Sequence, residues 1–298
     1  MAFLVLGGTG FIGREIVKQL STCNEEIIVL SRNHRHAVKI LGSAVKLIST
    51  LNELGSDKDI TGIINLAGES MAEGRWSEQR KKRLESSRID VTADIIELIR
   101  RLKVKPECLI SGSAIGYFGD SGDNILTEYS DSHEDFGSRL CASWEAQALR
   151  AKAYGVRVCI IRTGLVIGKN GGFVKKMLPS FKLGLGGKLG HGKQWMSWIH
   201  IIDITRIICT LVETPKMQGI YNATAPTPVT NAEFTKTLAF VLKKPAFIKL
   251  PTAILKLMFG EMAILLLTGQ RVIPDRLNKA GFDFKFNKLQ AALTDVLT

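Results

Sequence analysis

The chain has 298 residues, of which 45% are hydrophobic and 23% charged, and its 28 glycines and 8 prolines give no fibrous or disordered bias. The five cysteines form no close pair, which argues against a disulfide framework or a zinc site, and we expect no metal. The formal charge is +12 at pH 7, but the basic residues are scattered, so we expect no nucleic-acid partner.

The first twenty residues are expected to form a strand, a turn and a helix. Residues 2–7 are an apolar run, and REIVKQL at 14–20 has helical apolar spacing. Between them, residues 8–13 match GxGxxG, and Gly7 adds the GxxGxxG spacing. In this context the helix N-terminus can present free N–H groups and its positive dipole end to a pyrophosphate. We therefore predict a dinucleotide site formed by Gly7, Thr9, Gly10, Phe11, Ile12 and Gly13.

The second apolar run, Ile27–Leu30, indicates which dinucleotide is bound. An NAD-specific protein usually carries an acid at this strand end for the ribose hydroxyls. Ser31 and Arg32 stand there instead, and Arg32, helped by Ser31, could hold a 2′-phosphate by charge-assisted hydrogen bonds. The predicted cofactor is therefore NADP or NADPH.

Further strands are expected at Gly62–Leu66, Cys108–Ser111 and Val156–Ile161, and they alternate with helical stretches at Glu78–Leu102 and Ala142–Ala153. This alternation predicts an α/β fold, a Rossmann-like doubly wound parallel sheet. The ends of the first two of these strands are expected to contribute further residues to the cofactor site, namely Asn65, Leu66, Ala67, Gly68 and Ser111.

Beyond Ile161 the alternation loosens. We expect an NAD(P)-binding domain over 1–220, with part of a substrate lobe inserted at about 165–198, and a smaller C-terminal substrate lobe over 221–298 that packs on the carboxyl ends of the strands. The apolar run Ile254–Leu267 is too short to span a bilayer and is expected to be an amphipathic or core helix. We expect a cytoplasmic location because no leader pattern is found, and no membrane partner because no segment is long enough to span a bilayer.

Taken together, the motifs resemble the extended short-chain dehydrogenase/reductase superfamily, and in particular its atypical epimerase family. The resemblance implies a Rossmann-like domain that binds NADP, plus a smaller C-terminal lobe. Members are often labelled nucleoside-diphosphate-sugar epimerases or cell-division-inhibitor-like proteins, which does not define a mechanism. The segments on which the resemblance rests are GGTGFIG at 7–13, INLAGE at 64–69, SGSAIGYFG at 111–119, WEAQA at 144–148, RTGLVIG at 162–168, GKQWMSWIHIIDI at 192–204 and GQRVIP at 269–274.

The resemblance also raises the question of catalysis. Active short-chain dehydrogenases use a tyrosinate base, a lysine four residues later and a serine that polarises the carbonyl. Ser113 matches the serine, but counting back from Glu145 places Gly137 and Cys141 where the tyrosine and lysine belong. The usual dyad is therefore expected to be absent, and Tyr117 is the available phenol. Other possible proton carriers are Asp120, Glu128 and His200.

A fixed cation and nearby aromatic rings are candidates for the substrate pocket, namely Arg162, Trp195, Trp198 and His200. Alternatively, these residues pack between the two lobes. We expect an NADP-dependent oxidoreductase or nucleotide-sugar epimerase that acts on a small-molecule substrate. The alternative is a non-catalytic NADP-binding regulator with a protein partner, which the missing dyad favours. Whether the chain is an enzyme stays open at this point.

Overall fold

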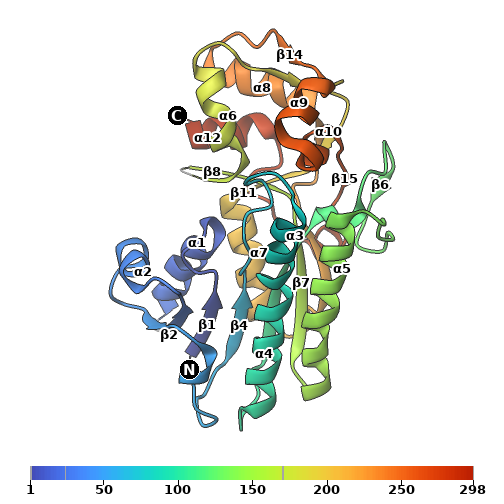
Figure 1. Ribbon diagram of the computed structural model, residues 1–298. Helices are drawn as coiled ribbons and strands as arrows, with labels where there is room; N and C mark the ends of the chain where they lie inside the picture. The colour runs from blue at the N-terminus through green and yellow to red at the C-terminus, as the bar shows by residue number, and fades with distance from the viewer. Residues whose placement is uncertain (1, 24, 170, 298) are drawn as a thin grey trace.

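A computed structural model describes residues 2–23, 25–169 and 171–297. Its centre is a sheet of seven strands in the order β12-β7-β5-β4-β1-β2-β3 (Figure 1). All six strand pairings are parallel, which confirms the predicted Rossmann-like α/β fold. The strands are β1 (Ala2–Leu6), β2 (Glu26–Leu30), β3 (Lys46–Ile48), β4 (Gly62–Asn65), β5 (Cys108–Ala114), β7 (Arg157–Thr163) and β12 (Gly219–Ala223).

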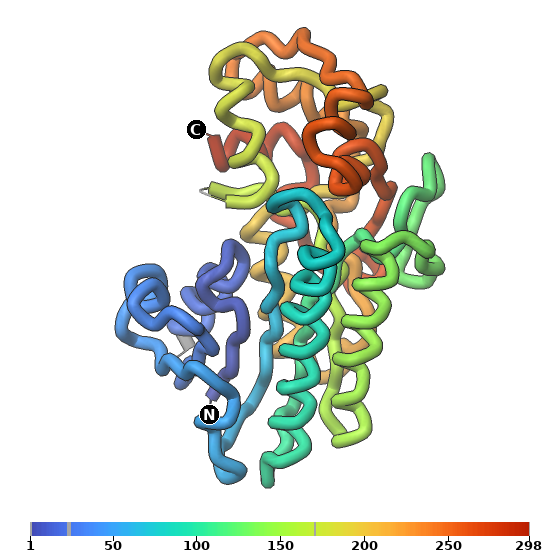
Figure 2. The backbone as a smooth tube through the Cα atoms, in the orientation of Figure 1, coloured from blue at the N-terminus to red at the C-terminus, as the bar shows by residue number. Residues whose placement is uncertain are grey.

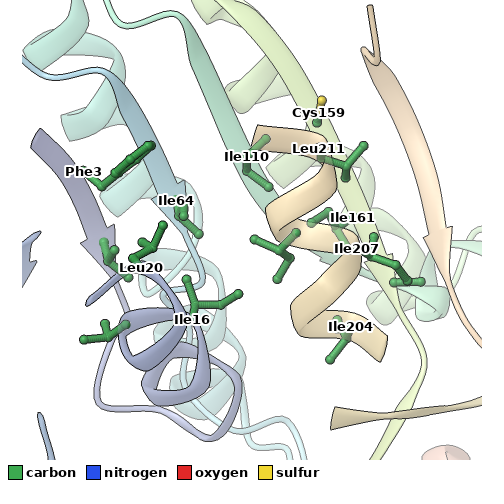
Figure 3. Close-up of a cluster of buried hydrophobic side chains, with 14 of the residues drawn as sticks. Phe3, Ile16, Leu20, Ile64, Ile110, Cys159, Ile161, Ile204, Ile207 and Leu211 are labelled. Carbon is green, nitrogen blue, oxygen red and sulfur yellow. The ribbon is translucent and has the colours of Figure 1, made fainter. Parts of the chain in front are cut away.

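Helices cover both faces of this sheet, so its inner strands are apolar on both sides. On one face lie α1 (Phe11–Leu20) and α7 (Ile201–Glu213). Figure 3 shows their side chains, among them Ile16 and Ile207, packed on strand residues such as Ile110. On the other face lie α4 (Ile89–Arg101) and α5 (Phe136–Leu149), while α2 (His34–Leu41) follows β2.

Two helix boundaries differ from the expected ones. The helix α5 begins six residues before Ala142, because the Asp135 carboxylate accepts a hydrogen bond from the Ser138 N–H at 2.9 Å and caps it. The stretch Glu78–Leu102 forms two helices, α3 (Glu78–Ser86) and α4. At the break, the Arg88 guanidinium donates to the carbonyls of Leu84 and Glu69 at 3.0 and 2.7 Å and holds the bend.

A C-terminal lobe sits over the carboxyl ends of the strands (Figure 2). Its core, which includes Trp198, Phe181 and Phe234, lies among α6 (Gly172–Lys182), α8 (Asn231–Leu242) and α12 (Leu289–Leu297). Short strand pairs complete it: β8 (Leu165–Gly168) with β11 (Trp198–His200), β10 (Trp195–Met196) with β13 (Val229–Thr230), β9 (Gly187–Leu189) with β14 (Ile248–Leu250), and β6 (Ile125–Leu126) with β15 (Arg271–Val272).

The apolar run Ile254–Leu267, expected to be one helix, is divided among α9 (Thr252–Phe259), a 3₁₀ turn and α10 (Ile264–Leu267). Gly260 has a φ of +59°, a conformation in which an α-helix cannot continue. The short helix α11 (Asp275–Lys279) follows β15. None of the helices that the structure describes is long and apolar enough to cross a membrane.

Candidate functional site

The turn between β1 and α1 depends on two glycines for its packing. Gly7 has a φ of +76°, and a Cβ atom there would lie 2.5 Å from the carbonyl oxygen of Leu66. A Cβ atom at Gly13 would lie 2.1 Å from the carbonyl oxygen of Gly7. Neither position can hold a side chain, because backbone atoms that cannot move aside already occupy the space.

Gly10 has a different environment. It is exposed, and within 4 Å an added Cβ would meet only the Gly7 carbonyl oxygen, at 3.0 Å. The first helical hydrogen bond of α1 runs from the Arg14 N–H to the Gly10 carbonyl, so the N–H groups of residues 11–13 precede the ladder. The first turn carries no acidic side chain. The turn is therefore open to an anion at the positive end of the helix dipole.

The end of β2 places a cation on the same edge of the sheet. Leu6 and Leu30 are register partners in the parallel β1–β2 pair, so the residues after each strand lie side by side. Arg32 is exposed there. Ser31 Oγ accepts from the Asn33 N–H at 3.3 Å, and Asn33 in turn caps α2. An exposed guanidinium on a turn whose backbone is fixed in this way suits a phosphate on the ribose.

The loop after β4 forms the other wall, where the strand order reverses and such folds bind their ligands. Asn65 is fully buried and fixes this loop: its Nδ2 donates to Thr92 Oγ1 at 2.9 Å, and its Oδ1 accepts from the Ala67 N–H at 3.2 Å. Leu66 and Ala67 are half-buried, and Gly68 is exposed. Ser111, the register partner of Asn65, is fully buried.

A buried polar network lies at the carboxyl ends of β5 and β7. Ser113 and Arg162 are register partners, and both reach Glu145 of α5. The Ser113 hydroxyl donates to Glu145 Oε1 at 2.6 Å, and Arg162 donates to both carboxylate oxygens at 2.8 Å. Such a bidentate pair fixes both side chains. The hydrogen of Ser113 is therefore directed at Glu145.

The sequence analysis did not include Glu145 among the site residues. A signal was present, because Cys141 and Glu145 are one helical turn apart and share a face. That face is the buried stripe of α5, which contains Leu140, Cys141, Trp144, Glu145 and Ala148. A carboxylate in a buried stripe needs a partner.

Tyr117 lies over this network. It belongs to the 3₁₀ turn Ile115–Phe118 that follows β5, and its ring centroid is 3.4 Å from the Arg162 Cζ. This stacking on the guanidinium sets the orientation of the ring. Among the residues that the structure describes, Arg162 Nη1 is buried and has no hydrogen-bond partner. The phenol is half-buried.

Gly137 and Cys141 face the same region from α5. Within 4 Å, a Cβ atom at Gly137 would meet only Asp135 Oδ1 at 3.3 Å and the Gly116 carbonyl oxygen at 3.9 Å. Burial raises the pKa of the Cys141 thiol to about 11, so this side chain is neutral at pH 7. Gly137 therefore contributes no side chain to this region, and its nearest neighbour in the turn that holds Tyr117 is the Gly116 carbonyl.

Trp195 lines a cavity of about 220 Å³ between the lobe and the loop after β5. Its indole N–H donates to Asp123 Oδ1 at 2.7 Å, and the Arg271 Cζ lies 4.4 Å from its ring centroid. Asp120 and Gln194 also line this cavity. Of the predicted aromatic wall, Trp195 therefore has access to a ligand.

The other ring residues are interior. Trp198 has no exposed surface, and its indole N–H donates to the Thr227 carbonyl at 3.1 Å. His200 is 1% exposed, and its Nδ1 accepts from the Ile202 N–H at the start of α7. Burial lowers the pKa of His200. Neither residue has surface for contact with a substrate.

Two further acids, Glu128 of the sequence analysis and Asp203 of α7, bind backbone groups. Glu128, which is buried, accepts from the Asn222 N–H at 3.0 Å, and burial raises its pKa. Asp203, which has no exposed surface, accepts from the N–H groups of Lys285 and Phe286 at 2.8 and 2.9 Å. The Arg276 N–H also donates to Glu128, at 3.4 Å, so both carboxylates tie the C-terminal segment to the rest of the chain.

The sequence profile of the NAD dependent epimerase/dehydratase family matches residues 3–224, which include the glycine turn and the Ser113 network. The chain belongs to this family. A second profile, a domain of unknown function called DUF1731, matches residues 250–296. The resemblance to the epimerase family with its own C-terminal domain is thereby confirmed.

Family members from distant organisms align over the whole chain. The epimerase family protein SDR39U1 homolog, chloroplastic, of Arabidopsis thaliana is 37% identical and covers 100% of this chain and 87% of its own length. The epimerase family protein YfhF of Bacillus subtilis is 36% identical, with coverage of 100% and 98%. The crystal structure of human SDR39U1 (isoform 2) with NADPH superposes with a TM-score of 0.90 at 34% identity and covers 99% of each chain.

Proposed function

We propose that this member of the epimerase family binds NADPH and reduces the carbonyl group of a small-molecule or nucleotide-linked substrate in the cytoplasm. The observation that carries the proposal is the position of an open glycine turn and an exposed arginine, Arg32, on one edge of the sheet. The human relative crystallised with NADPH supports the same cofactor.

The residues present fit this cofactor. The N–H groups of residues 11–13 would hold the pyrophosphate, since Gly10 leaves the approach open. Arg32 would hold the 2′-phosphate, with Ser31 beside it, because no acid at the end of β2 repels that group. The turn that Asn65 fixes would lie beside the adenine ribose. NADPH, when bound, supplies a hydride.

We propose that Tyr117 donates the proton that the substrate's carbonyl oxygen takes up during the reduction. Tyr117 is half-buried, its ring is oriented by Arg162, and Gly137 places no side chain next to the turn that holds it. Ser113 lies four residues before Tyr117 in the chain, but its hydroxyl donates to Glu145. Ser113 can therefore polarise a carbonyl only when its hydroxyl turns away from the carboxylate.

A non-catalytic NADPH-binding regulator with a protein partner is the second candidate. It is favoured by Gly137, which has no side chain, and by Cys141, whose thiol is neutral because burial raises its pKa to about 11. Neither position can supply the tyrosinate and the fixed positive charge on which ordinary short-chain dehydrogenases depend.

Single-turnover oxidation of NADPH with a panel of carbonyl and nucleotide-sugar substrates tests the proposal. Tyr117→Phe should slow hydride transfer by about 10²–10⁴. Tyr129→Phe, at an exposed tyrosine, is the matched control and should leave the rate unchanged. A substrate consumed at the same rate by Tyr117→Phe would contradict the role of Tyr117. Bound NADPH that no substrate oxidises would favour the regulator.

A further inference from the structure

The C-terminal lobe, which Figure 1 shows at the end of the molecule away from the amino end of β1, exposes large apolar side chains. Phe247 is 91% exposed, Leu257 76% and Leu183 74%. The segments that carry them are neighbours: β9 pairs with β14, a Cβ at Gly184 would touch Pro245 at 3.4 Å, and α9 follows β14 directly. We call this surface the distal face, and its other exposed apolar side chains are Leu185, Ile248, Ile254 and Met258.

The charge of these segments has one sign. Residues 171–202 contain five lysines, and residues 234–260 contain five more, while neither stretch contains an aspartate, a glutamate or an arginine. Exposed lysines alternate with the exposed apolar side chains of the distal face, namely Lys182, Lys243, Lys244, Lys249 and Lys256. Apolar side chains interspersed with lysines are complementary to a partner in which negatively charged groups cover an apolar layer.

The helix α9 shows that the apolar side chains are not turned inward. Of its eight residues, only Leu255 is buried. The helix is held instead through its backbone, since the Arg75 guanidinium donates to the carbonyls of Leu257 and Met258. A helix fixed in this way presents its apolar side chains to whatever covers the distal face.

We propose that the distal face binds the surface of membranes rich in anionic phospholipids, as a peripheral contact that no segment spans. This goes beyond the proposed function and departs from the expectation of no membrane partner, which rested on the absence of a spanning segment. Leucine, isoleucine and phenylalanine flanked by lysines are typical of segments that lie in a bilayer interface.

A protein partner fits the distal face less well. Protein interfaces are enriched in tyrosine, tryptophan and arginine and depleted in lysine, whereas the two lysine-rich stretches contain no arginine or tyrosine, and their one tryptophan-bearing segment, 195–198, lies outside the distal face. A second copy of the chain would bring two sets of lysines together without acids to pair them. Anionic headgroups supply the missing negative charge.

Vesicle flotation with the full chain tests the proposal. The protein should bind vesicles of phosphatidylcholine mixed with phosphatidylglycerol, bind phosphatidylcholine alone far more weakly, and dissociate as salt is raised. Lys243→Gln, Lys244→Gln and Lys249→Gln together should weaken binding about 100-fold. Phe247→Ser with Leu257→Ser should weaken it about tenfold or more.

The matched control is Lys103→Gln with Val104→Ser, which removes one lysine and one exposed apolar side chain next to the amino end of β5. It should bind vesicles like the wild type, and thermal melts establish that all variants fold. Equal binding to both vesicle types, or unchanged binding by the lysine triple variant, would overturn the proposal. Sedimentation that reveals a dimer abolished by Phe247→Ser with Leu257→Ser would assign the face to a second copy instead.

Discussion

The buried Arg162–Glu145 pair should be among the most sensitive points of the fold. The two side chains are 2% and 5% exposed and share two hydrogen bonds of 2.8 Å. Arg162→Met leaves the Glu145 carboxylate in the interior with only the Ser113 hydroxyl as a donor. Removal of one partner of a buried ion pair costs about 3–5 kcal/mol, a large share of the 5–15 kcal/mol by which domains are typically stable.

Glu145→Gln in the Arg162→Met background removes the stranded charge and keeps an acceptor for Ser113. The double variant should therefore be more stable than Arg162→Met by about 2 kcal/mol. Urea unfolding followed by circular dichroism measures the whole cycle. Arg100→Met, which breaks the exposed Arg100–Glu97 pair, is the control and should change the free energy of unfolding little. An Arg162→Met variant as stable as the wild type, or additive effects in the cycle, would refute the reasoning.

Two further predictions concern single residues of the fold and the turn. Gly10→Val should fold but lose stabilisation by NADPH, whereas Gly13→Val should fail to fold because its Cβ would lie 2.1 Å from the Gly7 carbonyl oxygen. Thermal melts with and without NADPH measure both effects. If NADPH still raised the melting temperature of Gly10→Val, the phosphate site would lie elsewhere. Burial lowers the pKa of His200 from 6.5 in the fold, so the unfolded chain takes up the proton first and the wild type should lose stability relative to His200→Asn as pH falls below 6.5. The slope is at most about 1.4 kcal/mol per pH unit, and identical pH profiles of the two proteins would contradict it.

What the sequence could predict depends on how local the responsible contacts are. The glycine turn is encoded within Gly7–Gly13 and its flanking strand and helix, so its motif and its context indicate the same structure. The parallel strands were predictable because β1, buried along its whole length, is a continuous apolar run. The early start of α5 was missed since its first turn carries Gly137 and Ser138, which are weak helix formers.

The Ser113–Glu145–Arg162 network was not predictable in the same way. It joins two strands and a helix, and Ser113 and Glu145 are 32 positions apart in the chain. Residue type alone also failed to separate Trp195, which lines a cavity, from Trp198, which lies in the core of the lobe. Trp195 lies in the β10–β13 pair and Trp198 in the β11–β8 pair, and which of these pairs borders the cavity depends on packing between distant segments.

Calorimetric titration with NADPH and NADH tests most directly whether NADPH is the cofactor and whether Arg32 selects it. The wild type should bind NADPH more tightly, and Arg32→Ala should lose about 1.5–3 kcal/mol with NADPH while its affinity for NADH stays the same. This loss corresponds to about 10- to 150-fold in Kd. Lys39→Ala, at an exposed lysine of α2, is the control and should preserve the preference. Equal affinity of the wild type for both cofactors would contradict the claim.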